Sequence, residues 1–279
     1  MHPLRHTDKF GDFANISRLT RRPAHSLTRL SSGCPKRRIH SCVCAKQTWA
    51  RDNAAMSLAP VRVTIIEVDL DAYPRDEAIL SDAERARAAA FRFDSLRKRY
   101  VAAHCALRHT LAGHVGAQAR DLMFATSAHG RPSLVNRPTG LDFNLAHSAG
   151  FALIAIAHEA RIGVDIEPVR PIDDRMTLAA RFFAPGETTA LRAVPSHEAD
   201  AAFLRCWTRK EAYIKGLGLG LSHSLNAFEV SLDADARLLN DKTDPSASAR
   251  WSLHDLSRPP RYIAALAADR PIVVFREER

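Results

Sequence analysis

The chain lacks long hydrophobic runs. Nowhere in its 279 residues is there a stretch close to the roughly 18 consecutive apolar residues of a membrane-spanning helix. Its start also lacks the apolar segment that follows the basic residues of a secretory signal peptide. We therefore expect a cytoplasmic protein without a membrane partner. The Gly-rich pattern of a P-loop is missing too, which excludes that kind of phosphate-binding loop.

Cysteine is scarce and odd in number, with five residues: Cys34, Cys42, Cys44, Cys105 and Cys206. The last two lie inside apolar helical patterns, where cysteine usually acts as a small buried hydrophobe. The other three are crowded near the start, beside His40. A zinc site there is an alternative, but Cys-x-Cys is not a standard finger spacing. Reduced thiols are the simpler interpretation for a cytoplasmic protein.

The positive net charge of +9 is concentrated at one end of the chain. Residues 1–55 contain eleven Lys or Arg and three acidic residues, which leaves a net charge of about +1 for residues 56–279. A nearly neutral body offers little electrostatic attraction to DNA or RNA. We therefore expect no nucleic-acid partner, and any basic site on the body must be local.

Residues 1–57 have no sustained hydrophobic period and are rich in Arg, Ser, Pro and His. Such a segment buries too little apolar surface to order itself, so we predict a disordered basic leader. The alternating strand pattern of 61–68 begins soon after Met56, which makes that methionine a credible native start. An organelle transit peptide is the alternative interpretation.

The body shows the order strand, helices, strands twice, in residues 58–160 and again in 161–279. This order predicts an α+β fold of two similar lobes, a pseudo-dimer in which each lobe packs an antiparallel sheet on helices. A cleft between two lobes of one chain needs no second subunit, so we expect a monomer. The expected strands are 61–68, 121–126, 142–146, 151–157, 161–167, 227–232, 250–256, 262–267 and 272–275, and the expected helices are 83–93, 94–112, 174–181, 186–193 and 197–216.

The run Gly163-Val164-Asp165-Ile166-Glu167 is the strongest local signal. Side chains two apart on a strand point to the same face, so Asp165 and Glu167 present two carboxylates together. Such a pair repels itself unless a cation lies between, and Mg²⁺ prefers oxygen ligands. A solvated strand edge carrying two acids is the alternative.

A second signal lies in the helical stretch 203–218, where Trp207, Glu211 and Lys215 are spaced four apart and share one face. Glu211 can supply a third carboxylate to the metal, while Lys215 and Lys210 can meet phosphate oxygens. The alternative is an exposed Glu–Lys pair, which is common on helices. A tryptophan on the same stripe argues against it, because it implies a half-buried face.

Two further motifs say little alone: the strand end Asp142-Phe143-Asn144-Leu145-Ala146-His147-Ser148 and the turn His129-Gly130-Arg131-Pro132. Together with Gly163–Glu167, Arg181-Phe182-Phe183 and the block from Trp207 to Gly218, however, they occur in a specific order. That order resembles the Sfp-type phosphopantetheinyl transferases. The resemblance spans roughly residues 62–275 and leaves out the leader.

The resemblance implies roles for individual residues. Asp165, Glu167 and Glu211 correspond to Mg²⁺-binding acids, and Lys210 and Lys215 to lysines that contact the phosphates of coenzyme A. The remaining implied contacts with coenzyme A are His147 near its 3′-phosphate, Arg131 and Pro132 in place of a family Gly-Lys-Pro, and the first-lobe arginines Arg87, Arg99 and Arg85. Glu84 departs from the pattern, because some relatives have a cation at that position.

The implied reaction moves the 4′-phosphopantetheine arm of coenzyme A onto a serine of an apo carrier protein and releases adenosine 3′,5′-bisphosphate. Charge neutralisation and positioning dominate such phosphoryl transfers. Glu211 is the first choice for general base, and Lys215 offsets charge on the leaving phosphate. The alternative enzyme is a Mg²⁺-dependent nuclease or phosphodiesterase. The alternative that is not an enzyme is a module whose basic leader binds nucleic acid or membranes, with an inactive body.

Overall fold

The structure is a computed structural model that describes residues 59–135 and 138–278. The predicted leader, its cysteines and the proposed start at Met56 lie outside the described residues. Among the residues that are described, none of the helices combines the length and the apolar character needed to cross a bilayer.

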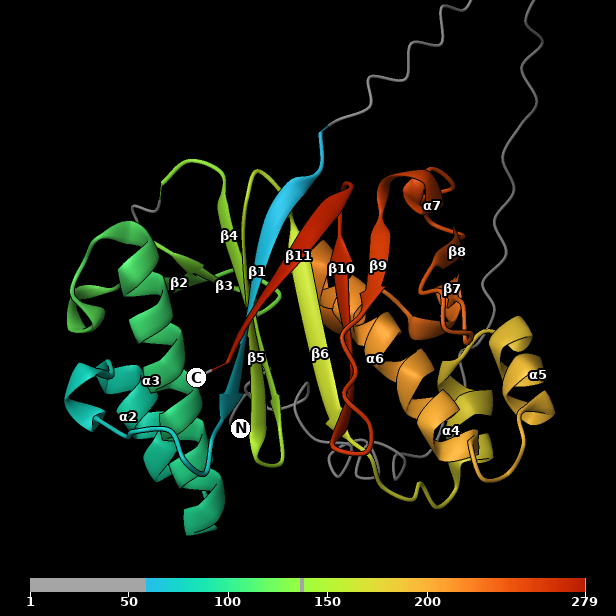
Figure 1. Cartoon of the computed structure of the whole chain (residues 1–279), viewed down its shortest axis with the longest axis horizontal. Helices are drawn as coiled ribbons and strands as arrows, with labels where there is room; N and C mark the ends of the chain where they lie inside the picture. Colours follow the sequence, from blue (N-terminus) through green and yellow to red (C-terminus); the bar gives the residue numbers. More distant parts are fainter. Residues whose placement is uncertain (1–58, 136–137, 279) are drawn as a thin grey trace, which may run out of the picture.

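Two sheets form the centre of the molecule, and helices cover both outer sides (Figure 1). On one side lie α2 (Asp82–Ala89) and α3 (Asp94–Val115). On the other lie α4 (Arg175–Phe182), α5 (Pro185–Ala193) and α6 (Ala199–Leu217). The short α7 (Ala247–Arg250) lies near the ends of the second sheet's strands.

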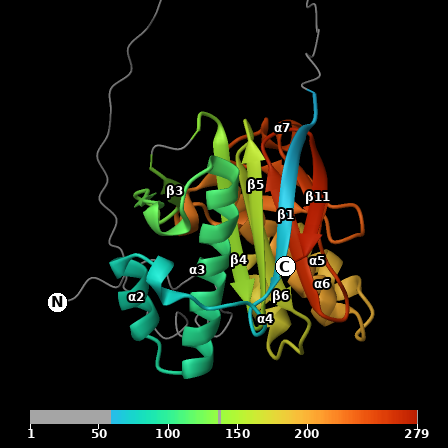
Figure 2. The ribbon, with the colours of Figure 1, turned by 60° about the vertical axis from the view of Figure 1, so that its left-hand side comes forward.

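The first sheet has the strand order β11-β1-β5-β4. Its strands are β1 (Val61–Asp69), β4 (Leu141–Ser148), β5 (Phe151–His158) and β11 (Ile272–Glu278). β1 runs antiparallel to β5, which runs antiparallel to β4, whereas β11 joins the edge parallel to β1. Figure 2 shows α3 lying in front of this sheet.

The second sheet is antiparallel throughout, in the order β6-β10-β9. Its strands are β6 (Ile162–Pro168), β9 (Ser252–Asp255) and β10 (Tyr262–Ala268). Two small antiparallel ribbons complete the described strands: β2 (Phe124–Thr126) with β3 (Pro132–Leu134), and β7 (Phe228–Val230) with β8 (Leu238–Asp241).

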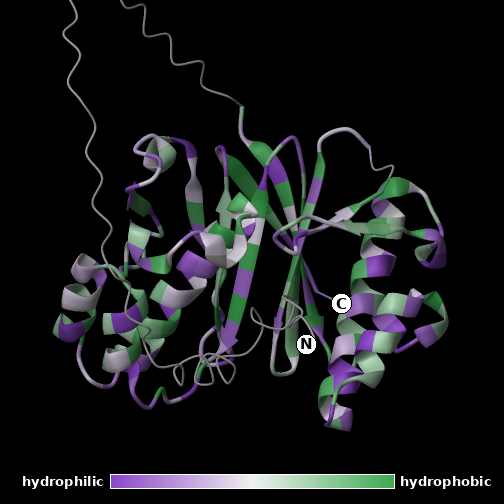
Figure 3. Ribbon diagram, turned by 180° about the vertical axis from the view of Figure 1, so that it is seen from behind, coloured by the Kyte–Doolittle hydropathy of each residue, from purple (hydrophilic) through white to green (hydrophobic). Residues whose placement is uncertain are grey.

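Hydrophobic side chains fill three layers of this arrangement. One cluster lies between α3 and the first sheet, and another packs α6 and its neighbours against the second sheet. A third cluster joins the two sheets: Ile65 and Leu153 from the first pack with Val164 and Ile166 from β6. The colouring in Figure 3 agrees, since hydrophobic residues concentrate on the central strands. Burial of β6 on both faces is what places its acidic side chains inside the protein.

The predicted mixture of helices and antiparallel sheets is confirmed, but the two similar lobes are not. The sheets differ in strand number and order, and β11 from the end of the chain belongs to the first sheet. The last strand of residues 161–279 therefore pairs with the first strand of residues 58–160. A parallel partner for β1 cannot be read from local patterns, because strand pairing between distant segments leaves no local periodicity.

Local sequence patterns predicted most of the described helices and strands but missed a few of them. Ser81 and Glu84 form a capping box at the start of α2. The second helix does not stop at Gly113, as predicted, but continues to Gly116, whose φ of 67° ends it in the left-handed conformation. The short β3 and β8 were not predicted, because three- and four-residue strands have almost no pattern.

Candidate active site

The alternation expected for β6 is present. Val164 and Ile166 pack between the two sheets, whereas Asp165 and Glu167 point to the opposite face, toward α6. Both carboxylates are buried, with 3% and 5% of their surface exposed. The solvated strand edge considered from the sequence is therefore wrong, since burying two like charges is costly unless something positive accompanies them.

Glycine lets α6 approach this strand closely. A Cβ atom on Gly163 of β6 would lie 2.1 Å from the carbonyl oxygen of Ala212 and 2.2 Å from the backbone nitrogen of Gly216. Any larger residue at Gly163 would force the helix away from the strand. The close contact brings the acidic side chains of β6 directly under the face of α6 that carries Glu211.

Trp207, Glu211 and Lys215 share a buried stripe of α6, as the spacing predicted. Glu211 is only 4% exposed, so the exposed Glu–Lys pair is also wrong. The ammonium nitrogen of Lys215 lies 2.5 Å from Oδ1 of Asp165 and donates a hydrogen bond to it. One cation from α6 therefore already faces the carboxylates of β6.

Burial raises the pKa of all three carboxylates. Burial and the charge of Asp165 raise the pKa of Glu211 to about 8. The same two causes, in the same order, raise the pKa of Glu167 to about 8. Burial also raises the pKa of Asp165, although the ammonium of Lys215 acts against it. A second positive charge among these groups would stabilise all three carboxylates.

The donor atoms fit a divalent cation that prefers oxygen. Oδ2 of Asp165 and Oε2 of Glu211 are buried and accept no hydrogen bond from the described residues. Within 59–135 and 138–278, however, no three His, Cys, Asp or Glu side chains are already grouped closely enough to hold an ion. The fold thus gathers suitable ligands in one place but leaves the cluster open, with Lys215 against one of its members.

β4 binds β6 through side chains, which the sequence reasoning missed. Asp142 accepts a hydrogen bond from the backbone of Ile162 at 2.9 Å, and Asn144 accepts one from Val164 at 2.8 Å. Ser148 donates to Oε2 of Glu167 at 3.0 Å. The period-two spacing of these polar residues in an apolar strand was the available signal.

His147 lies among the residues of β4 that face away from β6. Burial lowers its pKa to about 4, and the nearby charges of His104 and Lys215 act in the same direction. The imidazole of His147 is therefore neutral in the free protein. An anion that binds beside it would favour its protonated form, so His147 is a suitable partner for an anion.

Comparison with known proteins identifies the kind of enzyme. A family model described as "4'-phosphopantetheinyl transferase superfamily" matches residues 161–267. "4'-phosphopantetheinyl transferase HetI" of Nostoc sp. is 34% identical over 232 residues, which cover 80% of this chain and 94% of that protein. The chain belongs to the 4'-phosphopantetheinyl transferase superfamily.

Other relatives agree with this membership. "4'-phosphopantetheinyl transferase psf-1" of Bacillus pumilus is 31% identical over 195 residues, covering 69% of this chain and 80% of that protein. "4'-phosphopantetheinyl transferase Sfp" of Bacillus subtilis is 31% identical over 151 residues, covering 54% and 65%. The predicted family and enzyme class are confirmed: the protein transfers phosphopantetheine from coenzyme A to an apo carrier protein. The nuclease alternative has no support.

Lys210 does not reach the site of this transferase. Its side chain is fully buried on another side of α6, and its ammonium lies 2.8 Å from Oε1 of Glu187. It also donates to the backbone oxygens of Leu225 and Phe228 at 2.8 and 2.7 Å. With these acceptors around it, Lys210 is not placed to contact coenzyme A, and we assign it to the packing of α6 against α5 and β7.

Arg131 and Pro132 lie at the β2–β3 ribbon, where Arg131 reaches the end of α6. Its guanidinium donates to the backbone oxygen of Lys215, to Oδ2 of Asp142 at 2.7 Å and to the backbone oxygen of Ile162 at 2.8 Å. The resemblance implies that Arg131 contacts coenzyme A, but its guanidinium is already hydrogen-bonded to protein acceptors. Pro132 is the half-buried first residue of β3.

The first-lobe arginines lie on α2 and α3. Arg99 forms a two-point ion pair with Asp71, with nitrogen–oxygen distances of 2.7 and 2.8 Å, close to the β4–β5 turn at Gly150. Arg87 is half-buried, with its guanidinium 5.2 Å from the ring centre of Phe91. Both remain candidates for contacts with coenzyme A.

The contacts of Glu84 explain why this chain has an acidic residue where some relatives have a cation. Its carboxylate accepts hydrogen bonds from the buried Arg108 at 2.7 and 2.9 Å and lies 3.0 Å from Nδ1 of His104. It also caps α2 through the backbone of Ser81. Arg85 donates to the backbone oxygens of Leu80 and Glu77 and to Asp82, so it stabilises the start of the same helix.

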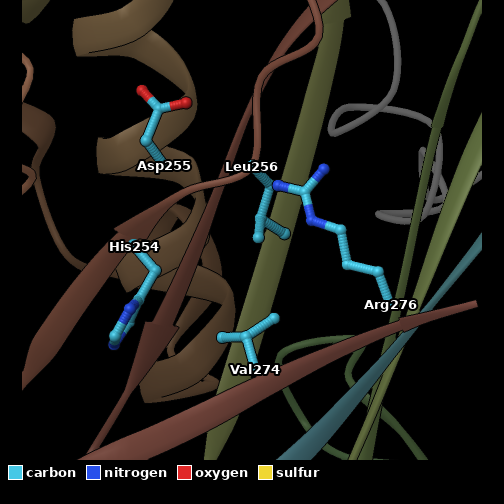
Figure 4. Close-up of a pocket in the computed structure, with 5 residues that line it drawn as sticks. All are labelled: His254, Asp255, Leu256, Val274 and Arg276. Carbon is cyan, nitrogen blue, oxygen red and sulfur yellow. The ribbon is translucent and has the colours of Figure 1, made fainter.

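An open pocket elsewhere has none of these features. It measures about 470 Å³ and lies between the end of β9 and β11, lined by His254, Asp255, Leu256, Val274 and Arg276 (Figure 4). None of the carboxylates of β6 and α6 borders it. We therefore place the candidate active site between β6 and α6.

Proposed function

We propose that this transferase acts at the β6–α6 site, with Asp165, Glu167 and Glu211 as ligands of Mg²⁺. The observation that carries the proposal is the set of buried carboxylates, two of them with an unpartnered oxygen, beside the ammonium of Lys215. Such a set is expensive to bury without a cation. When bound there, Mg²⁺ would neutralise the pyrophosphate of coenzyme A and fix its orientation.

The reaction joins the carrier serine to the pantetheine phosphate. The serine oxygen attacks the β-phosphorus of coenzyme A, and the bond from that phosphorus to the bridging oxygen breaks, which releases adenosine 3′,5′-bisphosphate. We propose that Glu211 accepts the serine proton, because its unpartnered oxygen belongs to the same cluster. Lys215 offsets the negative charge that develops on the leaving phosphate.

His147, Arg87 and Arg99 are the proposed contacts with the rest of coenzyme A. His147 already lies close enough to Lys215 for that charge to lower its pKa. One end of coenzyme A can therefore contact His147 while its phosphates face Lys215. We also keep the predictions of a monomeric, cytoplasmic enzyme and of a first lobe in 58–160 and a second in 161–279.

The activity test measures the mass of apo carrier proteins after incubation with coenzyme A and Mg²⁺. We expect one serine to gain the mass of a phosphopantetheine arm. No gain on any of several fatty-acid, polyketide and peptide carriers would argue against the proposed reaction in this chain.

The site test replaces Asp165 with Ala. We expect turnover to fall by at least about a hundredfold, on the scale of losing one main electrostatic contact in a transition state. The exposed Asp173 follows β6 closely, and Asp173→Ala is the matched control that should retain full activity. Full activity of Asp165→Ala in Mg²⁺ would show that the metal ligands lie elsewhere.

A further inference from the structure

The side chain of Arg131 forms hydrogen bonds with three elements of the fold. Its side chain is 17% exposed and pairs with the equally shielded Asp142 of β4 at 2.7 Å. The same terminal nitrogen donates to the backbone oxygen of Ile162, where β6 begins, and the other donates to the backbone oxygen of Lys215 in the last turn of α6. The three acceptors come from β4, β6 and α6.

The contact with α6 satisfies a specific need of that helix. The last carbonyl groups of a helix carry partial negative charge that favours a cation. The Lys215 carbonyl accepts one backbone hydrogen bond, from Gly218 at 3.2 Å, which Gly218 shares with Ile214, and Arg131 adds a charged donor to it. α6 ends at Gly218, whose φ of 70° is left-handed. A Cβ on Gly218 would lie 3.2 Å from Cδ of Arg131, so the arginine also packs against this turn.

The last turn of α6 carries Lys215, a side chain of the candidate active site. Lys215, whose carbonyl Arg131 binds, places its ammonium on Asp165. Glu211 lies one turn earlier on the same face. A shift of the helix end would move Lys215 relative to β6, and misplacement by about 1 Å is enough to cost a large factor in a positioned reaction.

We propose that Arg131 is a positioning residue, which holds the end of α6 on β4 and β6 so that Lys215 faces Asp165. This inference rests on the proposed role of Lys215. It departs from the contact with coenzyme A that the resemblance implies for this position. Both terminal nitrogens of Arg131 are engaged by protein acceptors, and the carboxylate of Asp142 balances the charge that would attract a phosphate.

The first experiment measures hydrogen exchange of the backbone amides of α6 in protein free of coenzyme A and Mg²⁺. In Arg131→Met, we expect the amides of residues 214–218 to exchange at least about tenfold faster than in the unaltered protein. Arg161→Met is the matched control, because Arg161 also donates to a carbonyl of this helix end, that of Leu217, but from an exposed position. Its effect should be clearly smaller.

The second experiment uses Arg131→Lys, which separates the two roles. A lysine keeps the positive charge but cannot reach three acceptors in three directions. A positioning role predicts that Arg131→Lys resembles Arg131→Met, with kcat reduced about tenfold or more and the preference for coenzyme A over dephospho-coenzyme A retained. A phosphate-binding role predicts that lysine restores activity.

These results decide the proposal. Unchanged exchange in Arg131→Met, equal acceleration in Arg161→Met, or loss of the preference for the 3′-phosphate would each overturn it. If Arg131→Met does not fold, Asp142→Asn replaces it and should accelerate exchange in the same turn. The exchange measurement needs no activity, so it stands even if Lys215→Ala leaves turnover unchanged, a result that would contradict the proposed function instead.

Discussion

Replacing Lys210 with Met distinguishes the role that the structure gives this residue from the one that its motif suggested. The ammonium of Lys210 is fully buried and pairs with Glu187, whose side chain is 1% exposed. Methionine has a similar length and no charge, so it fills the same space. The change therefore removes the charge and its hydrogen bonds while disturbing the packing little.

The expected loss of stability depends on the interactions that Glu187 keeps when Lys210 is replaced. Removing one partner of a buried ion pair typically costs about 3–5 kcal/mol, because the other charge stays buried without compensation. The carboxylate of Glu187 keeps hydrogen bonds from the backbone of Ala184 and Val230, at 2.8 and 2.7 Å, but loses its cation. For a folded body of this size, the melting temperature should fall by about 6–20 °C.

The assay is thermal unfolding followed by tryptophan fluorescence, together with transfer rates measured well below the melting temperature. At that lower temperature, Lys210→Met should keep the wild-type KM for coenzyme A. Lys215→Met is the comparison for activity, since it should lose turnover at the same temperature. Adding Glu187→Gln to Lys210→Met should restore part of the lost stability, because it removes the uncompensated charge.

One pattern of results would refute this reasoning. If Lys210→Met melts like the wild type and raises the KM for coenzyme A severalfold, Lys210 contacts the substrate. The arrangement of α5, α6 and β7 around its ammonium would then differ from the one described above.

Three further predictions concern the first lobe and the leader. Burial would raise the pKa of Glu84, but hydrogen bonds from His104 and Arg108 outweigh it and hold the pKa at about 2. The carboxylate therefore stabilises the fold above its unfolded pKa and loses this effect as the pH falls toward 2, so urea titrations should show Glu84→Gln destabilised at pH 7 and much less at pH 2.5. His147→Ala should raise the KM for coenzyme A and reduce discrimination against dephospho-coenzyme A, which steady-state kinetics with both substrates will check. A chain that starts at Met56 should keep its melting temperature and transfer rate; a large loss in calorimetry would show that the leader packs on the body.

The sequence predicted the parts of the site that lie within one element. Alternation along a strand is a property of the backbone, so Asp165 and Glu167 had to share a face wherever the strand lay. The same holds for Glu211 and Lys215 four apart on a helix. The capping pair at the start of α2 is equally local.

Only the tertiary structure separated the two lysines of α6. Lys210 and Lys215 are five residues apart, which turns them by about 140° around the helix axis. One therefore faces β6 and the other faces Glu187, but no local pattern states which side of a buried helix lies against which strand. Arg131 and Lys215, 84 positions apart, are a second example. Their contact exists because β4, β6 and α6 converge, and the packing of distant segments, not the residue type, decided that the arginine binds a helix end.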